Sequence, residues 1–466
     1  MTTGRSTRRR LLRATGALGL STLAGCLSNL NEEDDAPSPT PDPTDDASDR
    51  FPFDVTVDHE TADWDRYDPD WEAPETAPGP GSYGFKVLAE NLAIGWDLAF
   101  APSGELFVTE RTGRILTVNE GEYEPVAAPD SVVDAEALDP GSEEDSWYVT
   151  GGEGGLLGIA VHPNYPDVPL VYAYFTTEMD GERSNRVVAF DATAEDPTEE
   201  SWPIVGGIPG DTYHNGGRIT FGPANYLWIA TGDGDPGIEN PEKIADPGEL
   251  GGKILRVKPD GTAPEANPDI GEDADPRVFT YGHRNPQGIS FLPDGTPVIT
   301  EHGPGGGDEV NVLRPGGNYG WPEARNSGEF QRYEGTGYQR PVADAPSWAP
   351  SGSCFYTCDS VPSLQNRLLV GGLISQRLLA VTIARDGSRL SADHGTVHDA
   401  DWMDEAYHAA STGLLADELG RVRHVEQGPN GDLYAVTSNR DGRSGEPEED
   451  SFPKPNDDRL VRIVEE

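Results

Sequence analysis

The sequence predicts an all-β protein, a six-bladed β-propeller with four-stranded blades, and two observations lead to this prediction. The 466 residues include 56 Gly and 41 Pro, while 35% are hydrophobic, so turns are dense and elements are short, which disfavours a helical bundle. One phrase also recurs along the chain: an apolar pair, a Pro near a turn, then alternating apolar residues that end in Thr or an equivalent. Long repeats of this kind are typical of propeller blades.

The phrase has five clear copies. They are LAFAPSGELFVTE, IAVHPNYPDVPLVYAYF, ITFGPANYLWIATGD, ISFLPDGTPVITEHG and VEQGPNGDLYAVTSN, around Pro102, Pro163, Pro223, Pro293 and Pro429. Successive prolines are 61, 60, 70 and 136 residues apart, and 136 is twice 68. We therefore expect a sixth copy that has lost its signature, around residues 369–384. Each copy has the pattern strand, turn, strand, which predicts a β-hairpin.

The propeller is expected to span residues 83–466, or about 64 residues per repeat, which is enough for four short strands. Both ends of this range, 84–91 (GFKVLAEN) and 459–466 (RLVRIVEE), look like strands. They could share one blade, which would leave no free sheet edge. An array of β-sandwiches is the alternative, and the length and regularity of the repeats disfavour it.

Residues 1–26 have the features of an export signal. Paired arginines precede Leu11 and Leu12, as in the twin-arginine signal. The apolar stretch 14–24 is too short to span a bilayer as a lone helix but suits a signal peptide. Leu23-Ala24-Gly25-Cys26 resembles a lipobox, with Cys26 as the lipidated residue after cleavage; an accidental cysteine is the alternative. We expect an exported protein, anchored by lipid at the extracellular side of the cytoplasmic membrane.

Residues 27–82 are predicted to be an acidic, Pro-rich, disordered tether and lead-in. Up to residue 50 the segment is polar and has almost nothing to bury. Two cysteines remain in the propeller, Cys354 and Cys358, and their spacing is equally compatible with a small hairpin disulfide and with a free pair.

The charge balance excludes one class of partner. The chain has 82 acidic and 34 basic residues, a formal net charge of -48, and only five lysines. Binding to nucleic acid needs clustered basic side chains, which this surface cannot supply. The composition is typical of proteins adapted to molar salt, where the Debye length is about 3 Å and self-repulsion is screened. The charge therefore indicates the solvent, not the substrate.

Four polar stretches lie just outside the repeated strands, where the loops of a propeller converge. The first, 151–158 (GGEGGLLG), is rich in glycine, so its backbone can approach another group closely. It has neither the Lys nor the following helix of a phosphate-binding loop. The others are 213–218 (YHNGGR), 281–288 (YGHRNPQG) and 301–309 (EHGPGGGDE), the last followed by GGNYGWP. Burying the polar side chains of YGHRNPQG would be costly without a polar ligand.

In this order, the motifs GEGGLLG, HNGGR, YGHRNPQG, E-x-GP-x-x-x-DE-x-N and GGNYGWP resemble those of the soluble quinoprotein glucose/sorbosone dehydrogenases, also called aldose sugar dehydrogenases. The resemblance covers nearly all of residues 83–466. It implies a six-bladed propeller that binds pyrroloquinoline quinone (PQQ) and calcium. It also implies oxidation of the anomeric carbon of an aldose to the lactone, with the electrons passed to a small-molecule or protein acceptor that the sequence does not identify.

The resemblance assigns roles to individual residues. It implies that His214 is the catalytic base, a role that suits an imidazole near neutral pH. Arg284 would be a catalytic cation beside the cofactor oxygen, and both Arg284 and Asn285 would contact the cofactor. Arg421 and Arg423 would pair with the PQQ carboxylates, which guanidinium groups bind bidentately.

Three further positions follow from the same resemblance. Glu153 would belong to the cofactor site, and the main-chain carbonyls of Gly303 and Pro304 would bind calcium, which prefers oxygen ligands. Three positions depart from the pattern of the soluble glucose enzymes. Glu153 stands where those enzymes place a Gln near the sugar. Tyr213 replaces an Asp that precedes the base, so we expect the base to be tuned less strongly. Ile374 replaces a Lys that contacts the cofactor, with Arg377 nearby as a candidate substitute.

Two other functions are compatible with a propeller of this kind. A calcium-dependent lactonase would place acidic ligands on several blades, whereas the metal motif here offers main-chain carbonyls and Arg. A catalytically silent propeller would bind a carbohydrate or protein partner through the same loops. Such a module has no need for a base beside paired cations, so the dehydrogenase is the leading hypothesis.

Overall fold

The computed structural model describes residues 50–119, 121–133, 152–179, 181–234, 240–326, 333–385, 388–441 and 451–466. The chain divides into two compact units, Met1–Ser38 and Pro39–Glu466, and all described residues belong to the second. The predicted export signal, Cys26 and residues 27–49 lie outside the described residues. No helix within the described ranges is both long and apolar enough to cross a membrane.

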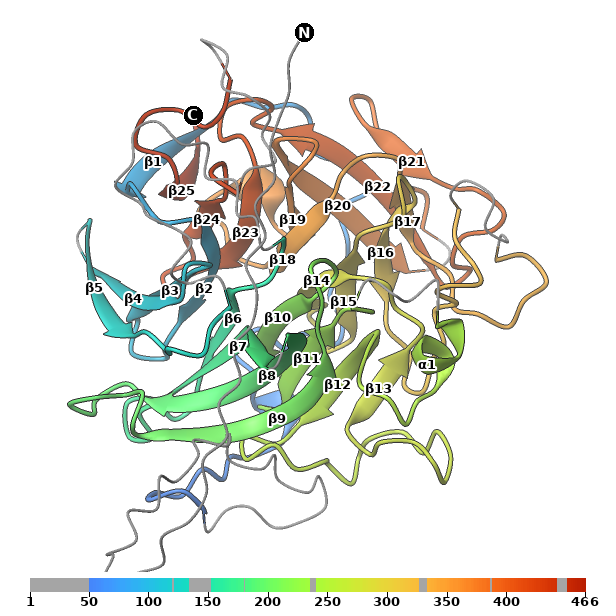
Figure 1. The fold of residues 1–466 in the computed structure, drawn as a ribbon. Coiled ribbons are helices and arrows are strands. Elements are labelled where there is room, and N and C mark those ends of the chain that lie inside the picture. The colour runs from blue at the N-terminus through green and yellow to red at the C-terminus, as the bar shows by residue number, and fades with distance from the viewer. Residues whose placement is uncertain are drawn as a thin grey trace, which may run out of the picture. The chain divides into compact units, whose positions relative to one another are not determined.

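The strands of the described residues form six antiparallel sheets (Figure 1). The first sheet contains β2 (Gly95–Phe100), β3 (Leu106–Glu110), β4 (Arg114–Asn119) and β5 (Glu122–Ala127). The second contains β6 (Leu156–Val161), β7 (Leu170–Met179), β8 (Glu182–Asp191) and β9 (Ser201–Pro209). The third contains β10 (Gly216–Phe221), β11 (Leu227–Thr231), β12 (Lys253–Val257) and β13 (Val278–Tyr281), with the short helix α1 (Pro241–Ala245) between β11 and β12.

The remaining three sheets come from the second half of the chain. The fourth contains β14 (Pro286–Phe291), β15 (Pro297–Glu301), β16 (Asp308–Val312) and β17 (Ala343–Ala345). The fifth contains, in spatial order, β18 (Pro350–Tyr356), β19 (Arg367–Gly372), β20 (Arg377–Arg385), β22 (Tyr407–Leu414) and β21 (Thr396–His398). The sixth contains β23 (Val422–Gln427), β24 (Leu433–Thr437), β25 (Leu460–Glu465) and β1 (Tyr83–Ala89).

These sheets are the blades of a six-bladed propeller. Their first strands contact one another in a closed cycle, in the order β2, β6, β10, β14, β18, β23 and back to β2. The sixth blade joins the two ends of the propeller, since β1 pairs with β25 and Lys86 lies opposite Arg462. The predicted fold class and the shared closing blade are confirmed. Blade five differs from the expected four strands because β21 adds a fifth.

Each clear copy of the repeated phrase forms the first two strands of a blade and the turn between them. Pro102, for example, lies in the turn that joins β2 to β3. In two copies the Thr that ends the phrase contacts the next blade: the Thr109 hydroxyl donates to the Leu157 carbonyl at 2.6 Å, and Thr300 donates to the Ser351 carbonyl at 2.6 Å. The phrase therefore recurs partly because these hydroxyls tie the inner hairpins of adjacent blades together.

The copy without a signature belongs to blade five, but its position was predicted one strand too late. Residues 369–384 fall on β19 and β20, whereas the first hairpin of the blade is β18 and β19. The connection 357–366, which contains the 3₁₀ turn η5 (Pro362–Leu364), replaces the usual Pro-containing tight turn. Cys354 is buried in β18, Cys358 is partly exposed, and both are free thiols.

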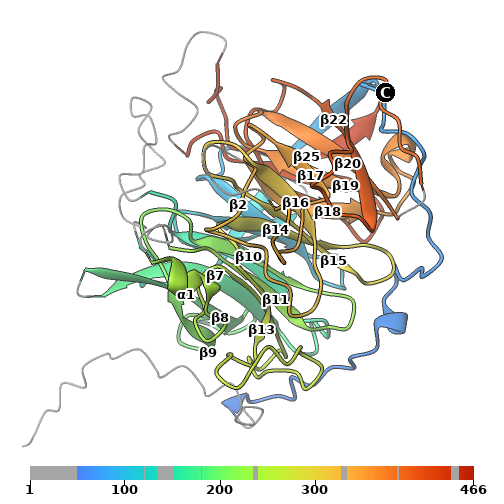
Figure 2. The same cartoon turned by 90° about the vertical axis from the view of Figure 1, so that its right-hand side faces the viewer.

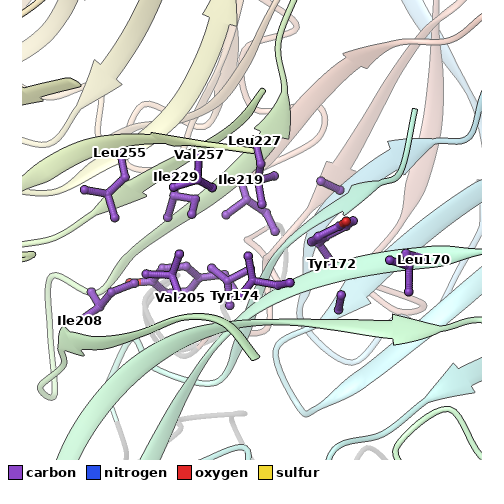
Figure 3. Close-up of a cluster of buried hydrophobic side chains, with 14 of the residues drawn as sticks. Leu170, Tyr172, Tyr174, Val205, Ile208, Ile219, Leu227, Ile229, Leu255 and Val257 are labelled. Atoms are coloured by element: carbon purple, nitrogen blue, oxygen red, sulfur yellow. The ribbon is translucent and has the colours of Figure 1, made fainter. Parts of the chain in front are cut away.

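Apolar side chains fill the space between neighbouring blades. Figure 3 shows this for blades two and three, where one row of side chains from β7 and β9 faces a second row from β10, β11 and β12. Tyr172, Tyr174, Ile219 and Ile229 belong to this cluster and are almost completely buried. Burial on this scale stabilises the ring and fixes the start of each inner strand, where the loops of the site begin.

The structure corrects the prediction of disorder for residues 50–82, which pack against the blades. Figure 2 shows this segment as the blue trace along one side, including the 3₁₀ turn η2 (Thr61–Asp63). Phe51, Val55, Val57 and Trp71 are all buried. Burial of these apolar side chains offsets the entropy cost of ordering the segment.

Replacement of Trp71 by alanine tests this packing. The Trp71 ring meets the Phe355 ring edge-on at a centroid distance of 5.2 Å, so its removal should lower the free energy of unfolding by about 3 kcal/mol. Denaturant unfolding in molar salt measures the loss. Tyr67→Ala is the control, because Tyr67 is 36% exposed and its loss should cost below ~0.5 kcal/mol. Equal effects of the two changes would mean that the segment does not pack on the propeller in solution.

Candidate active site

A cavity of about 190 Å³ lies where the innermost strands of the blades begin. All six blades contribute to its lining. Three arginines, Arg111, Arg421 and Arg423, line it together with two acids, Glu153 and Asp441. In a chain of net charge -48, a cavity with more cationic than anionic side chains is suited to an anionic ligand.

A larger cavity of about 650 Å³ lies at the other end of the same strands. It is lined by residues late in those strands, such as Phe100, Phe291 and Gln427, and by Trp64 and Arg66 of the N-terminal segment. None of the sequence-predicted site residues lines it. We therefore take the smaller cavity as the candidate active site.

His214, in the loop before β10, is fixed through both ring nitrogens. Its Nδ1 lies 2.9 Å from Asp233 Oδ1, and its Nε2 lies 2.8 Å from Arg284 Nη2. A guanidinium group can only donate, so Nε2 must be the accepting nitrogen and Nδ1–H donates to the carboxylate. This arrangement assigns a neutral imidazole whose Nε2 lone pair points to Arg284, the form required of a base.

Asp233 is a functional residue that the sequence analysis missed. It is buried, and its second oxygen, Oδ2, accepts a hydrogen bond of 2.7 Å from Trp321 Nε1. Tyr213 replaces an Asp before the base, but Asp233 supplies a carboxylate to the imidazole from the loop after β11. How strongly the base is tuned stays a prediction. A carboxylate in this position holds the imidazole in one tautomer and stabilises the imidazolium that forms on proton transfer.

Glu153 holds the loop that carries His214. Its backbone N–H donates to the Thr212 carbonyl at 2.7 Å, and its carboxylate oxygen Oε2 accepts from the His214 backbone N–H at 3.1 Å. Gly152, with φ +85°, lies so close to this loop that an added Cβ would be 2.0 Å from the Thr212 oxygen. The glycine-rich stretch predicted to approach another group closely therefore approaches the loop of the base.

Gly152→Ala should displace that loop. We expect turnover to fall at least ~10-fold, because a small displacement of a catalytic group is costly, and the protein to lose about 1–3 kcal/mol of stability. Gly181→Ala is a matched control, since Gly181 has a similar φ of +81° but nothing within 4 Å of an added Cβ. It should lose stability without losing turnover. Comparable loss of turnover in both variants would contradict the assignment.

Arg284 connects His214 to the glycine-rich loop after β15. Its Nη1 donates to the carbonyls of His302 and Gly303, at 3.2 and 3.1 Å. The loop is pinned by Asp308, whose Oδ1 accepts from the Gly303 backbone N–H at 2.9 Å. The predicted base, the predicted cation and one of the two predicted calcium ligands are thus brought together.

Asn285 has a different position. Its Oδ1 accepts a hydrogen bond of 3.0 Å from the Gly216 backbone N–H, its side chain is buried, and it does not line the cavity. In the structure it ties the start of β14 to the start of β10. Its contact with a cofactor stays a prediction.

Arg421 and Arg423 lie side by side at the start of β23 and share one carboxylate. Both donate to Asp441 Oδ2, at 2.6 and 2.9 Å, and Arg423 Nη1 also donates to Gln287 Oε1 at 3.1 Å. Burial lowers the pKa of Arg423 to about 9, so this group is cationic at neutral pH. Burial alone would raise the pKa of Asp441, but the two arginines lower it below its ordinary value.

Comparison with known proteins identifies the family. A family profile described as Glucose / Sorbosone dehydrogenase matches residues 92–445. The chain belongs to this family. It is 31% identical over 381 residues to an uncharacterized protein of Synechocystis sp., covering 76% of this chain and 84% of that protein. It is 29% identical over 390 residues to the aldose sugar dehydrogenase YliI of Escherichia coli, covering 80% and 93%. Among solved structures, the PQQ-bound form of the aldose sugar dehydrogenase from Streptomyces coelicolor has a TM-score of 0.62 and 32% identity, covering 83% of this chain and 99% of that one.

Within this family, the structure also shows where the chain departs from the expected pattern. Ile374 lines the cavity and is 66% exposed. Arg377 does not replace the expected Lys, because its Nε donates to the Ser375 carbonyl at 2.8 Å and it does not line the cavity. Arg111, which the sequence analysis missed, adds a cation from blade one and donates from Nη2 to the Gly152 carbonyl at 2.7 Å.

The repeated phrase contains a sequence signal that could have identified Arg111 and Asp233. Three side chains of the site stand two positions after the Thr that ends a copy of the phrase: Arg111 after Thr109, Asp233 after Thr231 and His302 after Thr300. The Thr ties its strand to a neighbouring strand or blade, so the residue two positions later leaves the sheet at the same end of each blade.

Proposed function

We propose that this chain is a PQQ-dependent dehydrogenase that oxidises the anomeric carbon of aldose sugars to the lactone and passes the electrons to a separate acceptor. One observation supports this most: the Nε2 lone pair of His214 points to Arg284, beside a cavity lined by three arginines. Family membership supports the same reaction class.

The cavity fits PQQ, which carries three carboxylates on a planar ring. Two polar atoms of the lining, Arg423 Nε and His302 Nε2, are buried without a hydrogen-bond partner in the described residues. Buried polar atoms of this kind are normally satisfied, so they mark where a polar ligand would bind. Arg421, Arg423 and Arg111 would hold the carboxylates through charge-assisted hydrogen bonds. When bound, PQQ supplies a quinone that takes up two electrons.

The side chains of the protein provide the acid-base chemistry. His214 Nε2 would take the proton of the anomeric hydroxyl, and Asp233 would stabilise the resulting imidazolium through Nδ1. Arg284 would stabilise negative charge that develops beside it. For this to occur, the sugar hydroxyl takes the place at Nε2 that Arg284 Nη2 occupies, 2.8 Å away, in the structure.

Calcium is part of the proposal and would be held by main-chain oxygens. The described residues contain no group of three or more His, Cys, Asp or Glu side chains placed to bind a metal ion. The Gly303 and Pro304 carbonyls are oxygen ligands of the kind that Ca²⁺ prefers. Gly303 sits in a tight cradle, where an added Cβ would be 2.1 Å from the Gly306 oxygen.

The structure supports the dehydrogenase over the alternatives. A lactonase of the kind considered would place carboxylate ligands from several blades around a metal, and no such group occurs in the described residues. A silent binding propeller gives no reason for an imidazole held at both nitrogens, by Asp233 and Arg284.

The remaining sequence-based expectations belong to the same proposal. We propose export, attachment to the outer side of the cytoplasmic membrane only through lipid at Cys26, no nucleic-acid partner, and function at high salt. They are supported by the sequence pattern of residues 1–26 and by the net charge of -48.

Reconstitution tests the proposal. The protein is folded in molar salt, loaded with PQQ and CaCl₂, desalted, and assayed for dye reduction with glucose, other monosaccharides and oligosaccharides. We expect quinone absorbance that remains with the protein and aldose-dependent dye reduction. Absence of both would favour the silent propeller, and hydrolysis of an added sugar lactone without dye reduction would favour the lactonase.

A further inference from the structure

Glu301, at the end of β15, holds two neighbouring residues of the YGHRNPQG motif. Its Oε2 lies 2.8 Å from His283 Nδ1, and its Oε1 accepts a hydrogen bond of 2.8 Å from the Arg284 backbone N–H. Arg325 forms an ion pair with the same carboxylate, and neither side chain is exposed to solvent. Burial lowers the pKa of His283 well below its ordinary value, so that imidazole is neutral and Arg325 provides the compensating charge for Glu301.

Trp321 connects Arg325 to Asp233, on the Nδ1 side of His214. Its ring centroid lies 5.7 Å from the Arg325 guanidinium carbon and 5.5 Å from that of Arg284, within the range of cation–π contacts. Trp321 Nε1 donates to Asp233 Oδ2 at 2.7 Å, and Asp233 Oδ1 lies 2.9 Å from His214 Nδ1. Arg325 is therefore connected to His214 through two separate series of contacts, one on each side of the imidazole.

Arg325 is itself held rigidly. It lies between β16 and β17 of blade four, and its guanidinium group meets Glu301 and Glu309 of the same blade. Its Nη1 pairs with Glu309 and lies 3.0 Å from the Tyr333 hydroxyl, which donates to Glu309 Oε1 at 2.7 Å. Burial raises the pKa of Glu309 to about 8, although Tyr333 and Asn311 donate hydrogen bonds to its oxygens. Arg325 thus pairs with both Glu309 and Glu301.

We propose that Arg325 is a positioning residue that closes a cycle of contacts around the base and thereby sets the direction of its Nε2 lone pair. The cycle runs through His214, Asp233, Trp321, Arg325, Glu301, Arg284 and back to His214. Arg325 does not line the cavity, so it acts only through other residues. The cycle is a property of the folded protein, and only its kinetic consequence rests on the proposed function.

Crystal structures of cofactor-free variants test the cycle. Arg325→Met removes the guanidinium group and its charge and keeps an unbranched apolar side chain. In this variant we expect the distance from Arg284 Nη2 to His214 Nε2, 2.8 Å in the unaltered protein, to exceed hydrogen-bonding range, beyond ~3.5 Å. Arg325→Lys should keep the contact. Retention of both contacts of His214 in Arg325→Met would overturn the proposal. If Arg325→Met does not fold, the double variant Arg325→Met with Glu301→Gln is used instead, because Glu301 then carries no buried charge without a partner. We expect the same increase in the distance from Arg284 Nη2 to His214 Nε2.

The same variants, loaded with PQQ and calcium, give a second readout. A displaced base should lower kcat about 10²-fold and leave KM and quinone retention nearly unchanged. The kinetic isotope effect with a C1-deuterated aldose should rise, which a smaller folded fraction cannot produce. Arg325→Lys should restore most of kcat. An unchanged kcat in Arg325→Met would contradict the proposal.

Arg314→Met is the matched control. Arg314 also lies between β16 and β17 and pairs with Asp404 at 2.6 Å, but it is outside the cycle. In Arg314→Met we expect the contacts of His214 and the value of kcat to match those of the unaltered protein. An equal loss of kcat in Arg314→Met and Arg325→Met would contradict the proposal, because it would show that anchoring of the loop, and not the cycle, is required. If the unaltered protein neither retains quinone nor turns over aldoses, the proposed function fails, while the crystal structures still decide on the cycle.

Discussion

His214→Ala should abolish aldose oxidation, with kcat reduced at least ~10³-fold. Within the described site, the imidazole Nε2 has an accepting lone pair that is held in place by Asp233 and Arg284. Quinone retention should be nearly unchanged, because His214 does not belong to the arginine-lined wall of the cavity. Dye-coupled turnover and quinone absorbance after desalting measure the two effects separately.

The control for this prediction is His394→Ala, which removes an exposed imidazole outside the site. Turnover of that variant should equal that of the unaltered protein. More than a tenth of the original kcat in His214→Ala would show that another group is the base.

Arg423→Ala should have the opposite effect and weaken quinone retention first. The Arg423 guanidinium is buried and shares Asp441 with Arg421. Its loss removes a charge-assisted contact to a carboxylate and leaves part of the Asp441 charge uncompensated, which should cost about 2–3 kcal/mol, or about 10²-fold in the Kd for PQQ. Equilibrium titration monitored by quinone absorbance measures the change, and kcat at saturating PQQ should stay within ~3-fold.

Arg377→Ala is the matched control, because this arginine belongs to the adjacent blade five but does not line the cavity. Its Kd for PQQ should not change. An unchanged Kd in Arg423→Ala would place the cofactor elsewhere. If Arg423→Ala and His214→Ala each lose both kcat and quinone retention, the two changes act through a general loss of structure.

The architecture could be predicted because its main interactions repeat. The inner hairpins of blades one, three, four and six have turns of the same length, and in several blades the same Thr bonds to a neighbouring strand or blade, as Thr109 and Thr300 do. The closing blade could be predicted because both ends of the propeller segment, 84–91 and 459–466, have the residue pattern of a strand. Blade five was misplaced by one strand because its first turn, 357–366, is built differently.

The packed segment 50–82 could not be predicted from its own residues. Phe51, Val55, Val57 and Trp71 are widely spaced in an acidic context, and each is buried by blade residues far away in the sequence. Local composition therefore indicated disorder, while the tertiary contacts that offset it were not visible.

The candidate site was predictable for residues inside the recognised motifs and less so for residues outside them. His214 and Arg284 were assigned correctly as neighbours, 2.8 Å apart. Asp233 was missed because it lies 19 residues after His214, and only the pairing of β10 with β11 within blade three brings the two together. Arg325 was missed because its relation to His214 runs through Glu301 and Arg284 and arises only when blades three and four meet. The cofactor contact of Asn285 stays a prediction, and in the structure its side chain binds the backbone of Gly216.

The central claim is that PQQ binds in the smaller cavity, between the arginine pair and the imidazole. A crystal structure of the protein with PQQ and calcium, grown in molar salt, tests it most directly. We expect the cofactor in the 190 Å³ cavity, with carboxylates within hydrogen-bonding distance of Arg421 and Arg423. PQQ in the 650 Å³ cavity at the other end of the inner strands, or a cavity that excludes it, would contradict the account.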